Sequence, residues 1–141
     1  MAITSTASTS WQGGLADGSG HTSLGSGVVS FDVDWKARSE GSDSTTTPEE
    51  LLAAAHASCY SMALSHELGQ HGTPPESVHV TAAVEFQPGE GVLRSVLTVE
   101  ATVPGLDQEL FGRFAEDAKT NCPVSKALAG IELVLASATL S

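Results

Sequence analysis

Two cysteines are the residues of this 141-residue sequence that could do the most chemistry. Cys59 lies in an apolar run, Cys122 directly precedes Pro123, and 63 positions separate the two thiols. A dithiol that closes and reopens needs one thiol of lowered pKa as the attacker and a second thiol nearby as the resolver. The spacing neither demands nor forbids a disulfide. For Cys59 the alternative is a small core side chain, which is what most buried free cysteines are.

Cys122 has a local argument for reactivity. Pro123 suits the first position of a helix, which would place Cys122 at the N-cap, where backbone N–H groups and the helix dipole stabilise a thiolate. Lys119 and Lys126 flank this position in the sequence. The alternative is that Cys122 substitutes for a polar N-cap residue in a tight turn.

Other kinds of active site have less support. His56, Cys59 and His66 fall roughly on one face of a helical run, but a zinc site needs further ligands, and neither CxxC nor HExxH occurs. We therefore expect no metal, and we interpret His56 as a polar group paired at a helix–helix contact. No GxSxG motif supports a serine hydrolase, and no Gly-rich phosphate loop is present.

A long helix must position Cys59. Thr47 is a good N-cap, Pro48 fits the first helical position, and Glu50 completes a capping box with Thr47. The pattern predicts a helix from Pro48 to about Gln70. This segment is apolar and rich in small residues on nearly every face, which is typical of a buried helix.

Predicted strands lie on both sides of this helix in the sequence. The alternation of Phe31, Val33 and Trp35 with polar residues predicts a strand over 28–38. Further strands are expected at 6–13, 21–26, 77–87, 91–103 and 131–140, and further helices at 108–120 and from Cys122-Pro123 to Gly130. This order predicts an α+β fold, with antiparallel sheets packed around the buried helix. We expect one domain over 1–141, with N-terminal strands in 1–46 and the helix and C-terminal part in 47–141.

The charge balance excludes several classes of partner. With 17 acidic and 6 basic residues, the net charge is −11, so the chain lacks the basic surface that binds nucleic acid or an anionic membrane. Residues 1–10 do not resemble a signal peptide, and the longest apolar stretch, 51–64, is too short to span a bilayer. We expect a cytoplasmic protein with a packed core and reduced cysteines.

Two motifs carry a family resemblance. The run from Thr47 to Met62, TPEELLAAAHASCYSM, resembles the signature of the OsmC/Ohr family of thiol peroxidases, and Asn121–Ser125 resembles its second cysteine motif. Residues 38–41 match the family in kind and position. The resemblance covers nearly the whole chain and is closer to the OsmC branch, because of the AAHASC run and the short interval between the arginine and the helix. Thr47 replaces the usual Asn, but both residues can N-cap a helix.

The resemblance implies a function and a set of site residues. The family reduces organic hydroperoxides, and in the Ohr branch hydrogen peroxide less well, with a dithiol such as dihydrolipoamide as electron donor and no cofactor. By motif, Cys59 would be the peroxidatic thiol, Cys122 the resolving thiol, and Arg38 with Glu49 the activating pair. The chemistry agrees, because burial raises a thiol pKa, a nearby Arg lowers it, and a carboxylate can hold the guanidinium through two hydrogen bonds. A sulfenate at Cys59 would then condense with Cys122.

The family fold is an intertwined homodimer with active sites at its interface, and helix geometry agrees. Glu49 and Cys59 would stand ~15 Å apart along a continuous helix and ~80° apart around it. We therefore expect Arg38 and Glu49 to serve the Cys59 of a partner chain. Two alternatives remain: a redox sensor or binding module that uses the same cysteine pair, and a structural or small-ligand-binding homologue with inert cysteines.

Overall fold

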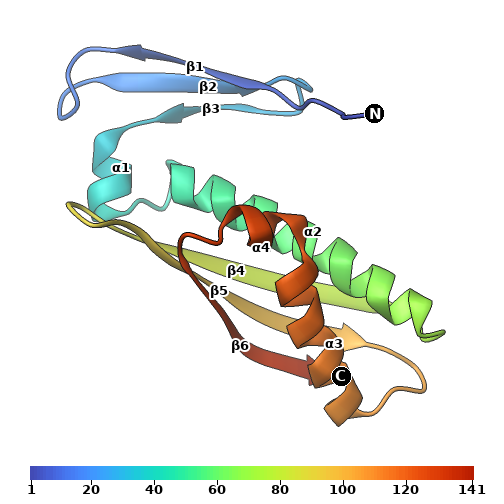
Figure 1. The fold of residues 1–141 in the computed structure, drawn as a ribbon. Helices are drawn as coiled ribbons and strands as arrows, with labels where there is room; N and C mark the ends of the chain where they lie inside the picture. Colours follow the sequence, from blue (N-terminus) through green and yellow to red (C-terminus); the bar gives the residue numbers. More distant parts are fainter. The chain divides into compact units, whose positions relative to one another are not determined.

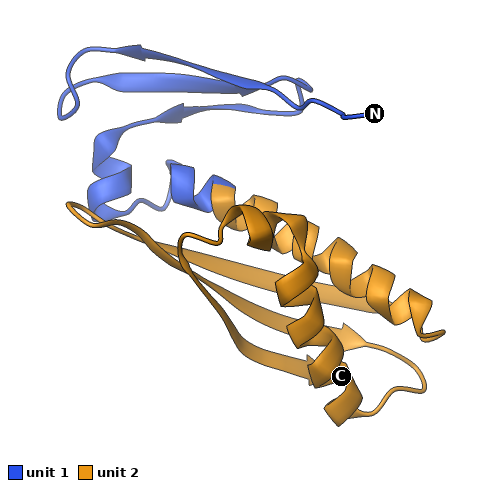
Figure 2. Cartoon of the chain, viewed as in Figure 1, with its two compact units in different colours: residues 1–51 blue, residues 52–141 orange.

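Apart from one short helix, strands and helices follow one another in the order that the sequence predicts for an α+β protein. The computed structural model describes residues 1–141. The chain forms two compact units, residues 1–51 and residues 52–141, and each sheet has three strands (Figures 1 and 2). The organisation of both units as one domain stays a prediction.

The first sheet is antiparallel, with the strand order β1-β2-β3. Its strands are β1 (Ala7–Gln12), β2 (Ser19–Leu24) and β3 (Ser30–Val33). Every residue of β1 is exposed, as its Ser- and Thr-rich sequence allows. Thr9 and Thr22 face one another on β1 and β2, and their hydroxyls are hydrogen-bonded at 2.7 Å.

The third strand is shorter than the sequence pattern predicts. The chain leaves β3 after Val33 and forms α1 (Trp35–Glu40), so the predicted strand over 28–38 is wrong beyond Val33. Asp34 causes the change, because its side chain accepts a 2.7 Å hydrogen bond from the backbone N–H of Ala37 and caps the helix. As a result, Arg38 lies in the last turn of a helix.

The long helix α2 (Pro48–Gln70) begins and ends where the sequence predicts. Thr47 caps it, since its hydroxyl accepts a 3.1 Å hydrogen bond from the backbone N–H of Glu50. The carboxylate of Glu50 accepts a 2.7 Å bond from the hydroxyl of Thr46, which takes the place of the second bond of a capping box. The change from Asn to Thr at position 47 therefore leaves the helix start intact.

The second sheet has the strand order β4-β5-β6. Its strands are β4 (Ser77–Gln87), β5 (Gly91–Thr102) and β6 (Glu132–Leu140), and α3 (Gln108–Asn121) and α4 (Pro123–Ala127) connect β5 to β6. Helices α2 and α3 cover one face of this sheet (Figure 1). The core between them contains Tyr60, Leu64, Leu68, Leu97, Val99 and Phe111, all fully buried.

One strand pairing differs from the prediction of antiparallel sheets. β4 and β5 form the predicted antiparallel hairpin, but β6 pairs with β5 in parallel. The connection through α3 and α4 explains this, because a helical crossover returns the chain to the start of β5 before the next strand begins. A two-residue turn could join only antiparallel strands.

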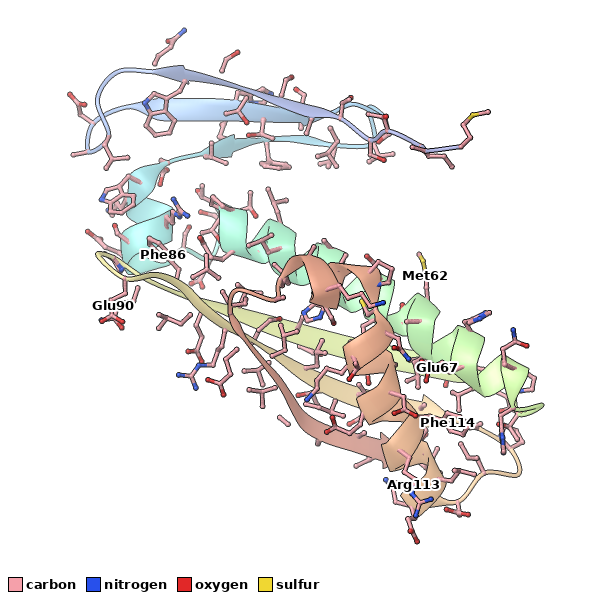
Figure 3. The ribbon with its side chains drawn as sticks, viewed as in Figure 1. Met62, Glu67, Phe86, Glu90, Arg113 and Phe114 are labelled. Atoms are coloured by element: carbon pink, nitrogen blue, oxygen red, sulfur yellow. The ribbon has the colours of Figure 1, made fainter.

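Within a single chain, one side of α2 is buried and the other side is exposed. His56, Tyr60, Leu64 and Leu68 are fully buried, whereas Met62 is 70% exposed and points away from the sheet of its unit (Figure 3). The exposed side also carries Ala54, Ala55 and Ser58. No helix in the structure has the length and apolar character needed to cross a membrane.

Two adjacent residues of β5 provide a test of the register. Leu97 is fully buried and Thr98 is exposed. We expect Leu97→Ala to lower the free energy of unfolding by about 2–5 kcal/mol, because it leaves a cavity in the core. The matched Thr98→Ala should change it by less than about 0.5 kcal/mol. Urea denaturation measures both values, and equal losses would contradict the register of β5.

Candidate active site

The structure brings the two cysteines together from separate elements. Cys59 is half-buried on α2, and Cys122 is fully buried at the junction of α3 and α4. Both are free thiols. Cys59 packs against the buried core cluster that contains Cys122, and Cys122 influences the ionisation of the Cys59 thiol, although 63 positions separate them in the sequence. The spacing in the sequence could not tell whether the two thiols lie close together.

The surroundings of Cys59 oppose its ionisation. Burial is the main influence that raises the pKa of the Cys59 thiol above 9.0, and Cys122 raises it further by hydrogen bonding and by charge. A backbone hydrogen bond from Val124 acts in the opposite direction and lowers the pKa. Because burial dominates, the surroundings of Cys59 favour the neutral thiol.

The structure confirms the predicted N-cap position of Cys122, but its thiol makes no capping hydrogen bond to the helix. Cys122 is the N-cap of α4 and Pro123 occupies the first turn. Its backbone N–H donates a 2.9 Å hydrogen bond to the carbonyl of Ala118, so Cys122 also ends α3. Of the two flanking lysines, Lys119 is engaged by Glu116, with Nζ 3.1 Å from the carboxylate. This ion pair reduces the positive charge that Lys119 can offer to a thiolate.

Arg38 and Glu49 form a close ion pair in the first unit. Arg38 Nη2 donates to Glu49 Oε1 at 2.8 Å, and Arg38 Nε donates to the same oxygen at 3.0 Å and to Oε2 at 3.3 Å. The carboxylate is 6% exposed and the guanidinium side chain 33% exposed. Two guanidinium nitrogens on one carboxylate fix the plane of the guanidinium. The pair is built by the last turn of α1 and the first turn of α2.

A buried histidine adds polar contacts beside the thiols. His56 Nδ1 is hydrogen-bonded to Ser95 Oγ at 2.7 Å, and His56 Nε2 to Ser125 Oγ at 2.8 Å. The ring therefore links α2 to β5 and α4, which confirms its interpretation as a paired polar group. With both nitrogens bonded to hydroxyls, His56 has no lone pair directed toward a metal shared with Cys59. The sequence gives no signal for Ser95 or Ser125, because they lie 39 and 69 positions from His56.

The predicted site residues thus form two groups. Arg38 and Glu49 meet in the unit of residues 1–51, and Cys59 and Cys122 meet in the unit of residues 52–141. The catalytic role of all four residues stays a prediction.

Residues 41–136 match the protein family described as OsmC-like protein. Peroxiredoxin OsmC of Escherichia coli (strain K12) is 40% identical over 122 residues, which cover 84% of this chain and 85% of that protein. The chain belongs to the OsmC-like family. Organic hydroperoxide resistance protein OhrB of Bacillus subtilis (strain 168) is 28% identical over 131 residues, covering 89% and 90% of the two chains. The higher identity with the OsmC protein agrees with the branch expected from the sequence.

Solved structures of OsmC-like and Ohr proteins have the same fold. An organic hydroperoxide resistance protein OsmC from Legionella pneumophila is 26% identical and superposes with a TM-score of 0.72 over 97% of each chain. An organic hydroperoxide resistance protein from Elizabethkingia anophelis is 27% identical, with a TM-score of 0.73 over 100% of each chain. The resemblance inferred from the two cysteine motifs is therefore confirmed.

The buried His56 predicts a pH effect on stability. Burial lowers the pKa of His56 below 6.5, so the unfolded chain takes up a proton near pH 6.5 that the folded chain takes up only at lower pH. Because the unfolded state then binds more protons than the folded state, the free energy of unfolding falls as the pH drops below 6.5. The slope from this one group is at most about 1.4 kcal/mol per pH unit.

His56→Gln should remove this component of the slope. Urea denaturation between pH 7 and pH 5 measures it, with His79→Gln on the exposed side of β4 as the control for losing a histidine. If His56→Gln and the parent showed parallel profiles, His56 would not be buried as a neutral imidazole.

Proposed function

We propose that this OsmC-like protein is a thiol peroxidase that reduces organic hydroperoxides, with Cys59 as the peroxidatic thiol. Relatives named peroxiredoxin OsmC and organic hydroperoxide resistance protein support a peroxidase-type function. The observation that carries the mechanism is the contact between a half-buried thiol and a fully buried one from a separate element. That arrangement suits an attacking and a resolving thiol.

The reaction has three balanced steps. The Cys59 thiolate attacks the outer peroxide oxygen, the O–O bond breaks, and the alcohol leaves after taking a proton, so that Cys59 becomes a sulfenate. The Cys122 thiol then attacks the sulfur of the protonated sulfenate, the S–O bond breaks, and water leaves from a Cys59–Cys122 disulfide. A dithiol of the lipoyl type reduces this disulfide and becomes a disulfide itself.

Exposure determines which sulfur each reagent reaches. Cys59 is half-buried and Cys122 is 0% exposed, so both the hydroperoxide and the reductant meet Cys59 first. Attack on Cys59 makes Cys122 the leaving thiolate. Apolar neighbours on α2, Met62 among them, favour hydroperoxides with an apolar body. A reducing, cytoplasmic compartment suits this cycle, because it supplies the thiols that regenerate the enzyme.

Ionisation of Cys59 is assigned to Arg38 of a second copy of the chain. Helix α2 is continuous, so Glu49 stands ten residues, or ~15 Å, from the Cys59 of its own chain. The guanidinium held by Glu49 would lower the pKa of the partner's thiol by roughly 1–3 units. The exposed side of α2, with its alanines and Met62, offers an apolar surface for such a homodimer.

Substitution of each cysteine separates the steps. We expect Cys59→Ser to abolish turnover of cumene hydroperoxide with a dithiol donor, because no nucleophile remains. Cys122→Ser should form the sulfenic acid and then over-oxidise to sulfinic acid, which mass spectrometry detects as the addition of two oxygens. Rapid multiple turnover distinguishes the enzyme from a redox sensor. Parental turnover by Cys59→Ser would show that the peroxidatic residue is another one.

Arg38→Ala tests the activation of the thiol. Loss of a pKa decrease of roughly 1–3 units should slow the peroxide step about 10- to 1000-fold at pH 7, with activity recovering as pH rises above 9.0. Arg113→Ala is the control, because Arg113 is exposed and bonded to Glu109 of its own helix, and it should react at the parental rate. Stopped-flow kinetics against pH measure both variants. Equal losses in the two would contradict a specific role for Arg38.

Mixing two variants tests whether the site is shared between chains. Cys59→Ser keeps Arg38, and Arg38→Ala keeps Cys59, so a mixed dimer contains one complete site only when Arg38 acts across the interface. We expect the mixture, after subunit exchange, to recover activity that neither variant has alone. If the mixture stayed as slow as the separate variants, Arg38 would act within its own chain.

A further inference from the structure

A buried hydrogen-bond chain joins the helices that carry the two thiols. His56 lies three residues before Cys59 on α2, and Ser125 lies three residues after Cys122 on α4. The His56–Ser125 bond measures 2.8 Å, and on its other side the ring is bonded to Ser95 of β5 at 2.7 Å. His56 and Ser95 are 0% exposed and Ser125 is 2% exposed. These hydrogen bonds therefore cross the interior of the protein next to the segments that carry the two thiols.

Helix α4 is short and depends on its surroundings for stability. α4 has five residues, too few for a helix that is stable by itself. Val124 in its first turn lowers the pKa of the Cys59 thiol through a backbone hydrogen bond, and Cys122 at its start raises that pKa. The His56–Ser125 bond is a side-chain link between α2 and the same short helix. It holds the segment that carries Cys122 against the helix that carries Cys59.

The imidazole is suited to this link. A neutral ring has one donor and one acceptor nitrogen on opposite sides, and a serine hydroxyl can serve as partner to either. Burial lowers the pKa of His56, which keeps the ring neutral. Both nitrogens are engaged by serines, so neither is directed at a sulfur. The ring is therefore linked to the Cys122 segment through Ser125 of α4 and has no nitrogen free for proton transfer to a thiol.

We propose that His56 is a positioning residue for disulfide formation, which through Ser125 holds Cys122 within bonding distance of the Cys59 sulfenate. This inference rests on the proposed function. A disulfide requires two sulfurs at ~2.05 Å and Cβ atoms at about 3.5–4.5 Å, so a small displacement of α4 slows the attack. A Cys59 sulfenate that Cys122 does not attack in time reacts with a second hydroperoxide. The hydroperoxide transfers one oxygen to the sulfur and leaves as alcohol, and the product is the sulfinate.

The test is the partition of the Cys59 sulfenate between disulfide and sulfinate. Ser125→Ala deletes the hydroxyl that bonds His56, and we expect disulfide formation to slow about fivefold to tenfold, and to slow more than the peroxide step. Stopped-flow kinetics give the two rates, and mass spectrometry after repeated peroxide additions gives the sulfinate fraction. Ser125→Thr retains a hydroxyl and should restore the parental partition.

Tyr60→Phe is the matched control. It also deletes one buried hydroxyl of the core, because Tyr60 Oη donates a 2.7 Å bond to the carbonyl of Ala115, but this bond leads to α3 and not to α4. It should lower stability and leave the partition as in the parent. If Ser125→Ala does not fold, His56→Phe, which keeps a ring in the cavity, takes its place with the same expected shift.

The outcomes are distinguishable. A parent that forms no Cys59 sulfenate would contradict the proposed function itself. A parent that turns over while Ser125→Ala partitions identically to it would overturn the role of His56 alone. Equal shifts in Ser125→Ala and Tyr60→Phe would also overturn it, because they would reflect general loosening of the core.

Discussion

The Cys59 thiol lies in surroundings that oppose the charge its chemistry requires. Burial raises its pKa, and the chain as a whole carries a net charge of −11. Both influences favour the neutral thiol, so reactivity depends on a cation placed nearby and held at a fixed orientation. The Arg38–Glu49 pair has the required form, because two guanidinium nitrogens bond one nearly buried carboxylate. In the proposed mechanism, the elements around these residues hold the ion pair and the second thiol in place.

Helix α2 was predictable from the sequence, and α1 was not. Thr47 and Pro48 form a local start signal, and the structure uses both. At β3 two local signals conflict, since the alternation through Trp35 favours a strand while Asp34 caps a helix. The cap prevails because its hydrogen bond forms within four residues. The motif made Arg38 a candidate site residue, but its helical position could not be predicted.

Contacts between residues far apart in the sequence were the second feature that could not be predicted. The alternating pattern predicted β6 but gave no direction for it, because parallel and antiparallel strands can have the same alternation. The crossover through α3 and α4 determines the direction. For the same reason, His56 was recognisable as a buried polar residue, but Ser95 and Ser125 were not recognisable as its partners. The contact between Cys59 and Cys122 likewise depends on the fold, and the family motifs implied it where spacing could not.

Helix α2 also fixes the spacing of two candidate site residues along its axis. It holds Glu49 in its first turn and Cys59 ten residues later, without a break. Inserting or deleting one residue between them would rotate Cys59 by about 100° around the axis and shift it by about 1.5 Å. Such a change would alter the separation of Glu49 and Cys59 along and around the helix even if every side chain were retained. The number of residues between Glu49 and Cys59 is therefore constrained more tightly than the identity of most of them. In this segment we expect substitutions to be tolerated and insertions or deletions not to be.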